Sequence, residues 1–505
     1  MADPVERPSI KPLNKWGGLK DTLKDKLRDP KKTFGSDNWP LVTGSALLGL
    51  VVAAGAVIAA GPWDSGQRKA EQEWAAARDR TGGAHHGRTV PGGPAPAPSA
   101  PAVLSALGTT AGREVPKAPK APKDTAGLPT ALGRLLGAPA LGSRATAAVI
   151  DTATGEQLYG HGAATLMTPA STVKIATAAA ALSALGPGHR ITTTVRASPD
   201  LRTVTLVGGG DPTLDKAALR SLAAGTARAL RAKGVTAANL RYDTSRYSGP
   251  ALHPIGPNEN IAPVSALMAD EGRLDRSDRG PAPRSEDPAG DAARAFAGYL
   301  GDNGVDTGAE PRAGRAPATS EPVATHRSAP LSALVERALT NSDNDIAEAL
   351  ARQTALAAGE PADFKGSRRA VTAQLKKLKV PMTGARLADG SGLDRDDRVS
   401  AGTLAALLAR AADPDHPELR PVLTGLPVAG FSGTLGERYT GTSVGTGLIR
   451  AKTGTLTGVN ALAGTVVDHR GRLLAFAFLA SGTPSAAEAE SALDALATAL
   501  TGNTR

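Results

Sequence analysis

The 505-residue chain contains no cysteine and few aromatic residues. The absence of cysteine excludes disulfide frameworks, thiolate nucleophiles and thiolate metal sites. Aromatic residues make up only 3% of the chain, so the hydrophobic core must be built mostly from Leu, Val, Ile and Ala side chains. At this length we expect two or more folding units together with non-globular segments.

The positive charge of the chain is not concentrated in one stretch. The formal net charge is +10, but the basic residues are spread out and few aromatic residues accompany them for base stacking. Proteins that bind nucleic acid usually combine a basic surface with stacking aromatics. We therefore predict no nucleic-acid partner, and attraction to anionic envelope polymers or lipid head groups is the more natural interpretation.

One long hydrophobic run stands out near the N-terminus. Residues 41–60 form a twenty-residue stretch without a charge, which as a helix covers about 30 Å of hydrocarbon. Trp39 and Trp63 flank the run, and indole rings prefer the membrane interface. The sequence therefore predicts one transmembrane helix over residues 41–62.

The residues before this helix favour one orientation in the membrane. Residues 1–40 carry a basic cluster at 24–32, which favours a cytoplasmic tail under the positive-inside rule. A cleaved signal peptide is the alternative, but the basic leader is long and the apolar stretch exceeds a usual signal core. We expect an uncleaved anchor of a single-pass cell-membrane protein, with the later residues outside the cytoplasm.

The rest of the chain divides into a linker and a globular part. Residues 63–127 are rich in Pro, Ala, Gly and Lys, with too few large apolar groups to fold. From residue 128 to 505, helical runs alternate with strand-like runs such as ATAAVID at 145–151 and LLAFAFLA at 473–480. This pattern predicts an α+β fold in which helices pack on an antiparallel sheet.

A serine and a lysine lie one helical turn apart after a proline. Ser171 and Lys174 form a Ser-x-x-Lys spacing behind Pro169, and residues i and i+3 of a helix have Cβ atoms roughly 5 to 6 Å apart. The alternative is an ordinary first helical turn without a catalytic role. Serine needs a base to act as a nucleophile, and a helix N-terminus would stabilise an oxyanion there.

Lysine can serve as that base only when it is neutral. Its pKa must then be lowered by desolvation or by a neighbouring cation, and Lys452 is a candidate for the second cation. It lies in RAKTGT at 450–455, which has the pattern of a strand edge leading into a hairpin. Gly454 would let a ligand approach this strand closely.

A third polar stretch lies between these two. The stretch NSDNDIAEAL at 341–350 contains Ser342, Asp343 and Asn344. Taken alone, this stretch is typical of a loop in which Ser342 or Asp343 caps a helix. Together with Ser-x-x-Lys and Lys-Thr-Gly it completes the motif set shared by class A β-lactamases and penicillin-binding proteins.

Further blocks narrow the resemblance to one family. They are VGGGDPTL (207–214), IAPVSALMADEG (261–272), ADGSGLDRDDRVS (388–400) and LPVAGFSGTLGERY (426–439). With the three motifs, they resemble the D-alanyl-D-alanine carboxypeptidase/endopeptidase family, the class C low-molecular-mass penicillin-binding proteins. The resemblance covers roughly residues 128–505 and implies a serine DD-peptidase, β-lactamase-like transpeptidase fold. The separation of 171 positions between Ser171 and Ser342 implies, by the same resemblance, an inserted subdomain at about 190–325.

The resemblance also implies a role for each motif residue. Ser171 would be the acylated nucleophile, Lys174 its general base, and Ser342 the group that carries a proton to the leaving amine. Substrate would be bound by four residues: Asn344, Lys452, Thr453 and Thr455. The backbone N–H groups of Ser171 and Thr455 would form the oxyanion hole, and no cofactor or metal is required.

The implied reaction removes the terminal D-alanine from peptidoglycan stem peptides, with β-lactams acylating the same serine. Whether the enzyme also cuts crossbridges stays open. One alternative is a β-lactamase, which needs a deacylating carboxylate, and the comparable stretch at 376–393 offers only Asp389. A non-catalytic β-lactam sensor or cell-wall scaffold is the other alternative. Two residues outside the motifs, Glu348 and Arg398, are expected to be structural ion-pair partners.

Overall fold

A computed structural model describes residues 127–502 of the chain. The predicted tail at 1–40, the predicted transmembrane helix at 41–62 and, apart from Gly127, the predicted linker at 63–127 lie outside the described residues. Within the described range, no helix combines the length and the apolar character that crossing a membrane requires. The prediction of a membrane span is therefore untested.

The described residues form ten α-helices and twelve strands. The helices are α4 (Leu128–Leu136), α5 (Lys174–Leu185), α6 (Lys216–Arg231), α7 (Pro288–Asp302), α8 (Leu331–Thr340), α9 (Asn344–Ala357), α10 (Phe364–Lys377), α11 (Ala401–Ala412), α12 (Arg420–Thr424) and α13 (Ala486–Ala499). The strands are β1 (Arg144–Asp151), β2 (Gln157–His161), β3 (Leu166–Met167), β4 (Thr192–Ala197), β5 (Thr203–Val207), β6 (Asn239–Asp243), β7 (Arg312–Ala313), β8 (Glu321–Arg327), β9 (Val399–Ser400), β10 (Ile449–Leu456), β11 (Val459–Val467) and β12 (Leu473–Ser481).

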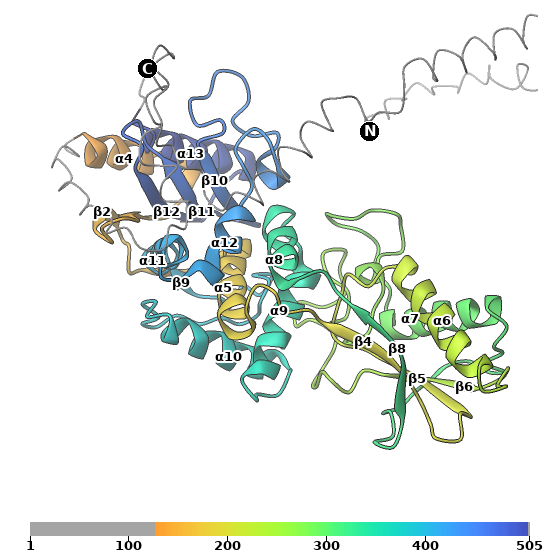
Figure 1. Ribbon diagram of the computed structural model, residues 1–505. Helices are drawn as coiled ribbons and strands as arrows, with labels where there is room; N and C mark the ends of the chain where they lie inside the picture. Colours follow the sequence, from red (N-terminus) through yellow and green to blue (C-terminus); the bar gives the residue numbers. More distant parts are fainter. Residues whose placement is uncertain (1–126, 503–505) are drawn as a thin grey trace, which may run out of the picture. The chain divides into compact units, whose positions relative to one another are not determined.

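The core of the described residues is built on a five-stranded sheet. Its order is β10-β11-β12-β1-β2, and every pair of neighbouring strands is antiparallel. Figure 1 shows this sheet with helices on both sides. The α+β prediction of an antiparallel sheet with helices is confirmed for the core. β10 is an edge strand, as the sequence of residues 450–455 predicts.

Alternation along β12 explains how the sheet packs on both faces. Phe476 and Phe478 belong to the hydrophobic cluster that includes α4 and α13. Ala475 and Ala477 belong to the cluster on the other face, which includes α5 and α11. Successive side chains of a strand point to opposite faces. The large aromatic side chains therefore fill one interface, while the alanines let helices lie close to the other.

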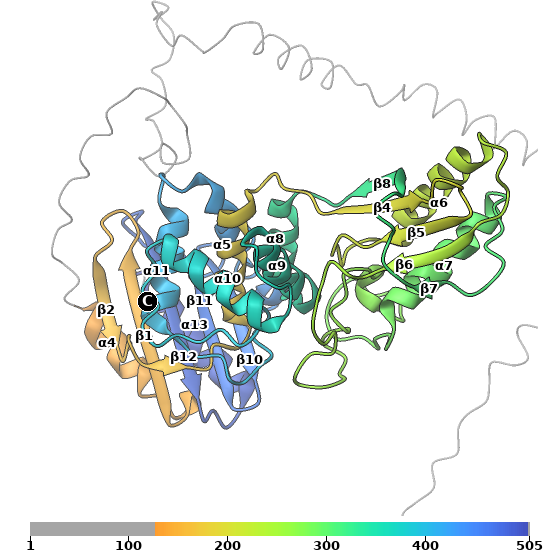
Figure 2. The ribbon, with the colours of Figure 1, turned by 90° about the horizontal axis from the view of Figure 1, so that it is seen from below.

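Helix α5 is rich in alanine because it is enclosed on all sides. Nine of its residues are buried, from Lys174 to Leu182, and it packs among α8, α9, α10 and α11 in the same cluster. Figure 2 shows α5 surrounded by these helices. A helix that is apolar on every face is a buried helix. Small side chains allow its neighbours to approach the turn that carries Ser171.

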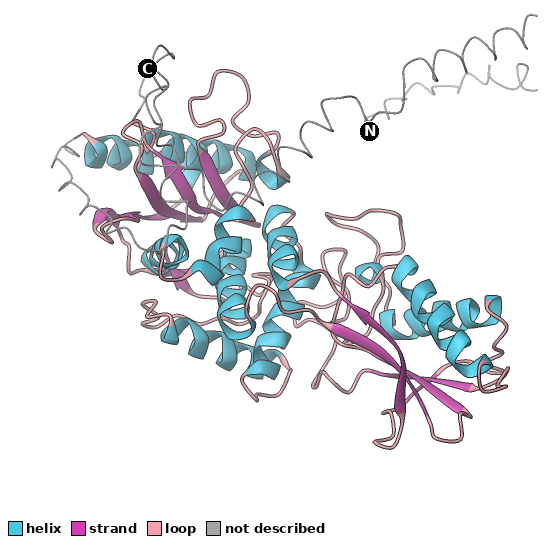
Figure 3. Ribbon diagram, viewed as in Figure 1, coloured by secondary structure: helices cyan, strands magenta, loops and turns pink. Residues whose placement is uncertain are grey.

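Between α5 and α8 the chain forms a second sheet. Its order is β7-β6-β5-β4-β8, and helices α6 and α7 pack on it (Figure 3). The pairs β5–β6 and β6–β7 are parallel, unlike any pair in the core. They are parallel because α6 and α7 form the crossovers between them. This mixed sheet was not predicted from the sequence, and we call residues 192–327 the inserted subdomain.

The longest irregular stretch of the inserted subdomain runs from β6 to α7. We call residues 244–287 the junction segment, because it bonds to the core at several points. The backbone N–H of Ala262 donates to Asp345 in α9, and Arg284 lies 3.0 Å from the same carboxylate. These contacts connect the inserted subdomain to the start of α9, directly beside the Ser342–Asn344 motif.

Candidate active site

The Ser171–Lys174 pair is held by a short helical turn. Ala170–Val173 form a single 3₁₀ turn that continues directly into α5, so Ser171 lies at the N-terminal end of this helical stretch. Lys174 Nζ is 2.9 Å from Ser171 Oγ. The prediction that the i, i+3 spacing brings these groups within hydrogen-bonding distance is confirmed.

Lys174 contacts two further oxygen atoms from distant parts of the chain. Its Nζ is 2.6 Å from Asn344 Oδ1 and 2.6 Å from the backbone carbonyl of Ser391. Both oxygens can only accept hydrogen bonds. A neutral amine has two hydrogens and one lone pair, so donating to both oxygens leaves the lone pair facing the Ser171 hydroxyl. This arrangement suits a general base.

The amide orientation of Asn344 is fixed from its other side. Asn344 Nδ2 donates to the backbone carbonyl of Asn260 in the junction segment, at 2.9 Å. The nitrogen faces a carbonyl, so the oxygen must face Lys174. The sequence analysis assigned Asn344 to substrate binding, whereas in this structure its carbonyl oxygen also orients the lysine.

The Ser342–Asn344 motif lies at the N-terminus of α9. The Asp343 carboxylate caps the helix by accepting a hydrogen bond from the Ile346 N–H at 2.9 Å, so the prediction of a helix cap is confirmed for Asp343. Ser342 has a φ of 58°, which is uncommon for a residue with a side chain. Its backbone conformation places Ser342 in the wall of the same cleft as Ser171.

Burial of Lys174 changes its acidity. Burial lowers the pKa of Lys174 to about 8, although the charges of Asp389, Asp343, Glu348 and Asp397 oppose the decrease. A charged amine without solvent is disfavoured because the low-dielectric interior does not replace its hydration. At pH 7 about one tenth of this lysine is therefore uncharged, as a base must be.

Lys452 belongs to the edge strand β10, but its side chain does not line the cleft. It is completely buried, and its Nζ donates to the Thr453 carbonyl at 2.8 Å. Burial, followed by the charge of Lys174, holds the pKa of Lys452 well below its usual range. The two lysines are therefore close enough to interact. Burial is the main cause of the lowered pKa of Lys174, and the hypothesis that Lys452 helps to make Lys174 neutral stays a prediction.

Thr453 and Thr455 face the cleft from β10. They alternate with Gly454, so both side chains point to one face of the strand. Thr453 Oγ1 donates to Thr434 Oγ1 at 2.9 Å, and Thr455 Oγ1 donates to Glu490 at 2.9 Å. Both threonines are therefore in position to contact a bound peptide.

The cleft itself has a volume of about 380 Å³. Its lining combines the motif residues with charged side chains of the junction segment and of the core. These are Ser171, Ser342, Asn344, Thr453 and Thr455 with Arg273, Arg284, Arg438, Asp343 and Glu490. Five of the seven predicted site residues therefore line one cleft, and Lys174 and Lys452 are buried beneath it.

The reason for a glycine at position 454 differs from the predicted one. A Cβ at Gly454 would lie 2.7 Å from the Pro169 carbonyl oxygen. The close neighbour is thus the backbone before Ser171 and not a ligand. Gly454 lets the edge strand lie directly against the turn that carries the serine, which fixes the position of Thr455 relative to Ser171.

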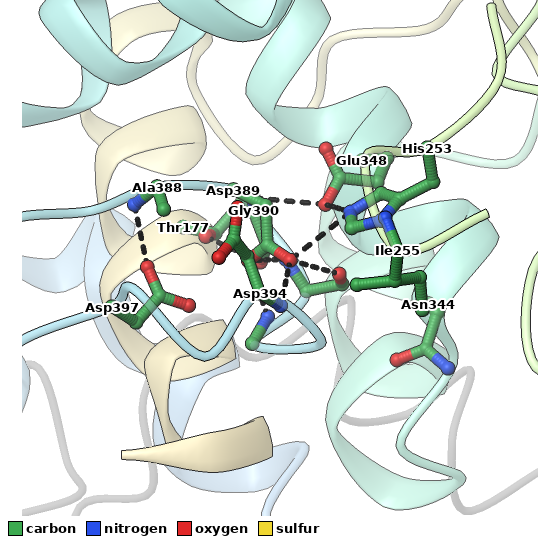
Figure 4. A network of polar contacts seen from close by, with 12 residues as sticks. Thr177, His253, Ile255, Asn344, Glu348, Ala388, Asp389, Gly390, Asp394 and Asp397 are labelled. Carbon is green, nitrogen blue, oxygen red and sulfur yellow. Dashed lines mark hydrogen bonds and ion pairs between the residues drawn. The ribbon is translucent and has the colours of Figure 1, made fainter. Parts of the chain in front are cut away.

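A tight turn at Asp389–Gly392 supplies the Ser391 carbonyl that Lys174 contacts. The Asp389 carboxylate accepts hydrogen bonds from the backbone N–H groups of Ser391, Gly392 and Asp394, and from Ser391 Oγ. His253 Nε2 lies 3.1 Å from the same carboxylate (Figure 4). Although burial opposes the change, the hydrogen bond from His253 and the other donors hold the pKa of Asp389 at about 2.

The residues around this turn have structural contacts. Glu348 in α9 accepts from the Gly390 N–H at 2.9 Å, and Arg398 donates to Thr168 and to the Arg395 carbonyl. The sequence analysis predicted that Glu348 and Arg398 are structural ion-pair partners. Glu348 lies 3.8 Å from His253 Nε2, whereas within the described residues Arg398 forms hydrogen bonds but no ion pair. The sequence analysis gave no role to His253, because a single histidine outside any motif carries no pattern that marks it.

Two clusters of described residues have ligand atoms within 4.8 Å of one another, as a metal site requires: His253, Glu348 and Asp389, and Glu271, Asp343 and Asp345. In the second cluster the carboxylates are already paired with arginines. Arg273 and Arg337 bind Glu271, and Arg284 binds Asp345. In the first cluster the carboxylates already accept hydrogen bonds from His253 and the 389–394 turn. We assign no metal to either cluster.

Comparison with known proteins agrees with this geometry. The model of the D-Ala-D-Ala carboxypeptidase 3 (S13) family matches residues 128–282 and 274–501. The chain belongs to this family. The resemblance to D-alanyl-D-alanine carboxypeptidases that the motifs indicate is therefore confirmed, and the enzyme class is that of a D-Ala-D-Ala carboxypeptidase.

Two mycobacterial relatives extend over most of the chain. A carboxypeptidase DacB of Mycolicibacterium smegmatis is 38% identical over 480 residues, covering 91% of this chain and 96% of the relative. A carboxypeptidase of Mycobacterium tuberculosis is 39% identical over 426 residues, covering 81% and 89%. Family membership therefore does not depend on isolated motifs.

Among solved structures, penicillin-binding protein 4 (dacB) of Haemophilus influenzae has a similar fold. The TM-score is 0.63 at 23% identity, and the match covers 74% of this chain and 98% of the other. The same protein complexed with a β-lactam gives a TM-score of 0.58. The serine DD-peptidase fold that the sequence predicts is therefore confirmed.

Proposed function

We propose that this protein is a serine DD-peptidase that removes the terminal D-alanine from peptidoglycan stem peptides through an acyl-enzyme on Ser171. The observation that carries the proposal is the position of Lys174 Nζ. It contacts the Ser171 hydroxyl and two acceptor-only oxygens, from Asn344 and Ser391, at 2.9, 2.6 and 2.6 Å respectively. A lysine so placed, with a pKa of about 8, has the properties of a base for serine.

In the first step, Ser171 Oγ attacks the carbonyl carbon of the D-Ala-D-Ala peptide bond while its proton passes to Lys174. The negative charge on the former carbonyl oxygen is stabilised by the backbone N–H groups of Ser171 and Thr455. The bond between carbon and nitrogen then breaks. The leaving amine takes a proton from Lys174 through the Ser342 hydroxyl, which completes the transfer.

In the second step, water attacks the ester and gives its proton to Lys174. The carbon–oxygen bond to Ser171 breaks, and the serine oxygen regains a proton. Asn344, Thr453 and Thr455 hold the peptide during both steps, and Lys452 contributes its charge beneath the terminal carboxylate when protonated. A β-lactam acylates the same serine, because opening of its ring forms the same kind of ester.

The contacts of Asp389 count against a β-lactamase. Its carboxylate accepts from three backbone N–H groups, from one hydroxyl and from His253. A carboxylate has about four lone-pair positions, so none is left to activate a deacylating water. Asp389 is also buried and does not line the cleft. We therefore expect a bound β-lactam to be released slowly.

The location of the enzyme is part of the same proposal. The predicted helix at 41–62 anchors the chain in the membrane, and the catalytic domain lies outside the cytoplasm, where peptidoglycan is found. The linker at 63–127 lets the domain reach its substrate. Exposure of intact and permeabilised cells to protease tests this location, since only an external domain is cut in intact cells.

One pair of measurements tests the chemistry. The protein is incubated with a penicillin, and mass spectrometry of its peptides locates the covalent label. In parallel, release of D-alanine from diacetyl-Lys-D-Ala-D-Ala is measured for the natural protein and for Ser171→Ala. We expect the label on Ser171 and no release by the variant. A label elsewhere, or unchanged release by Ser171→Ala, contradicts the proposal.

A further inference from the structure

The junction segment contacts both groups that accept hydrogen bonds from Lys174. One contact is direct: the Asn260 carbonyl accepts from Asn344 Nδ2 at 2.9 Å, which turns Asn344 Oδ1 toward the lysine. The other contact passes through the 389–392 turn, whose Ser391 carbonyl is the second acceptor. Ser391 lies 217 positions from Lys174 in the sequence. The helix that carries the base also contacts this turn, since Thr177 Oγ1 in α5 donates to the Gly390 carbonyl at 2.7 Å.

His253 is the junction residue that holds this turn. The Asp389 carboxylate folds the turn by accepting from Ser391, Gly392 and Asp394. From outside residues 389–394, the same carboxylate accepts a hydrogen bond from His253 Nε2 at 3.1 Å, and the Asp397 side chain also contacts it. Figure 4 shows the imidazole pointing from its loop toward Asp389 and Glu348. The histidine therefore connects the inserted subdomain to the Ser391 carbonyl through one carboxylate.

The imidazole is held in one orientation. Its Nδ1 faces the Ile255 N–H at 3.4 Å, so Nε2 carries the hydrogen that is donated to Asp389. The ring is 2% exposed and meets the edge of Phe364, with ring centroids 5.2 Å apart and planes at 89°. Glu348 Oε1 lies 3.8 Å from Nε2. Although burial acts against it, the hydrogen bond to Asp389 and the charge of Glu348 raise the pKa of His253.

We propose that His253 is a positioning residue for acylation, which acts with the Asn260 carbonyl to hold the two oxygen acceptors of Lys174 so that the lone pair of the amine points at the Ser171 hydroxyl. This inference rests on the proposed function, because it requires Lys174 to be the base. His253 itself touches neither substrate nor the reacting atoms. Its effect passes through Asp389 and the Ser391 carbonyl.

The physical reason is the directionality of the lone pair. Lys174 Nζ has three contacts, so its rotation about the terminal carbon–nitrogen bond is determined by where the two acceptors lie. A displaced Ser391 carbonyl would let a hydrogen of the amine turn toward Ser171, and the lone pair would turn away. Catalytic groups lose much of their effect when their geometry shifts by about 1 Å. Substrate binding in the cleft should be unaffected, because His253 does not line it.

Two variants of equal length separate this role from simple packing. His253→Gln keeps a nitrogen donor close to the position of Nε2, whereas His253→Met has the same shape without a donor. Phe364→Leu is the control, since it removes the ring contact of His253 but leaves the hydrogen bond to Asp389. For each full-length variant, stopped-flow acylation by a penicillin gives the limiting rate constant and the dissociation constant of the complex that precedes the covalent bond.

We expect His253→Met to lower the limiting acylation rate by about 30-fold, a part of the roughly 10²- to 10⁴-fold that a general base contributes. Its dissociation constant should stay within about twofold of the natural value, because only the chemical step is affected. His253→Gln should recover the rate to within about threefold. Phe364→Leu should lower the melting temperature without changing the acylation rate of the folded protein.

Two results would overturn the proposal. One is a folded His253→Met variant that is acylated at the natural limiting rate, and the other is a His253→Gln variant that is acylated as slowly as His253→Met. If His253→Met does not fold, His253→Asn replaces it, because its shorter side chain stops before Asp389. Failure of the proposed function looks different. In that case the natural protein carries no label on Ser171, whereas here the label forms on Ser171 in every variant and only its rate changes.

Discussion

The catalytic core and the junction segment both bury charged side chains, but they treat the charge in opposite ways. In the core, the nearest contacts of Lys174 and Lys452 are neutral oxygens, from Ser171, Asn344, Ser391 and Thr453. Where the junction meets α9, carboxylates face arginines, as in Arg284 and Asp345 at 3.0 Å. Desolvation without a direct counter-ion lowers the pKa of an amine. At the junction each carboxylate has a cation beside it, although burial and the charge of Asp343 raise the pKa of Asp345 to about 7.

In the core, burial changes the acidity of a lysine that takes part in the proposed reaction. At the junction, the buried ion pairs hold two segments of the chain in fixed positions. A lysine whose pKa is about 8 supplies a neutral amine near physiological pH. An ion pair between buried groups adds little net stability, but breaking it leaves an uncompensated charge. The inserted subdomain therefore contributes to the active site by fixing the start of α9 and the 389–392 turn, and it supplies none of the motif residues.

The largest effect is expected from the loss of Lys174, the buried lysine of the core that we propose as the base. An unchanged acylation rate would contradict the role that we give to burial in this region. We expect Lys174→Met to lower the rate of acylation by about 10³-fold or more, because the methionine sulfur is too weak a base to take the proton from Ser171. Mass-spectrometric time courses of penicillin labelling give the rate. The exposed Lys377 in α10 offers a matched control, and Lys377→Met should label at the natural rate.

The junction is tested by removing one partner of its ion pair. Arg284→Met removes the cation paired with the buried Asp345. At pH 8, above the pKa of about 7 that burial gives this carboxyl group, the free energy of unfolding should fall by about 3 to 5 kcal/mol. Arg294→Met removes an exposed pair with Asp291 in the same subdomain, where both side chains are 47% exposed. That loss should stay below about 1 kcal/mol. Urea unfolding measures both, and equal losses would contradict the distinction.

The pH dependence of acylation sharpens the account of the core. Only neutral Lys174 accepts a proton, so the rate should rise with pH through the pKa of about 8 and level off above it. At pH 7 it should be about one tenth of the plateau. Because burial accounts for this pKa, Lys452→Met should leave the midpoint unchanged. If the midpoint of the pH profile moves well above 8 in this variant, the result supports the hypothesis that Lys452 lowers the pKa of Lys174.

The smallest effect is expected at the rim of the cleft, where charge is neither buried nor essential. Glu490 accepts from Thr455 Oγ1 at 2.9 Å and lies 3.6 Å from Arg438. Glu490→Gln keeps an oxygen acceptor for the threonine, so hydrolysis of diacetyl-Lys-D-Ala-D-Ala should change by less than about threefold. A loss comparable with that of Lys174→Met would mean that Glu490 takes part in the chemistry.

The main elements of the core were predictable from the sequence for local reasons, whereas most of the site was implied by the resemblance to the carboxypeptidase family. The apolar run at 473–480 predicts a strand, and the pattern of residues 450–455 predicts an edge strand. The Ser342–Asn344 motif predicts a capped helix, which Asp343 caps. The mixed sheet of the inserted subdomain was not predictable in this way, because parallel pairing depends on the crossover helices α6 and α7 and not on any one strand.

His253 and the Ser391 carbonyl escaped the sequence analysis for a similar reason. A backbone carbonyl carries no mark in the sequence, and an isolated histidine resembles any other. Gly454 was correctly singled out as a point of close approach, but its neighbour is Pro169 and not a ligand. Contacts between segments about 130 to 220 residues apart are set by tertiary packing, which no local pattern encodes.

The sequence by itself determined that Ser171 and Lys174 lie together, because one helical turn places residues i and i+3 on the same side. It also determined that Thr453 and Thr455 share a face, because strands alternate. Only the tertiary structure decided that Lys174 is buried and that Asn344 and Ser391 accept its hydrogens. Solvent exclusion and the meeting of distant oxygens arise when the core and the junction segment pack around α5.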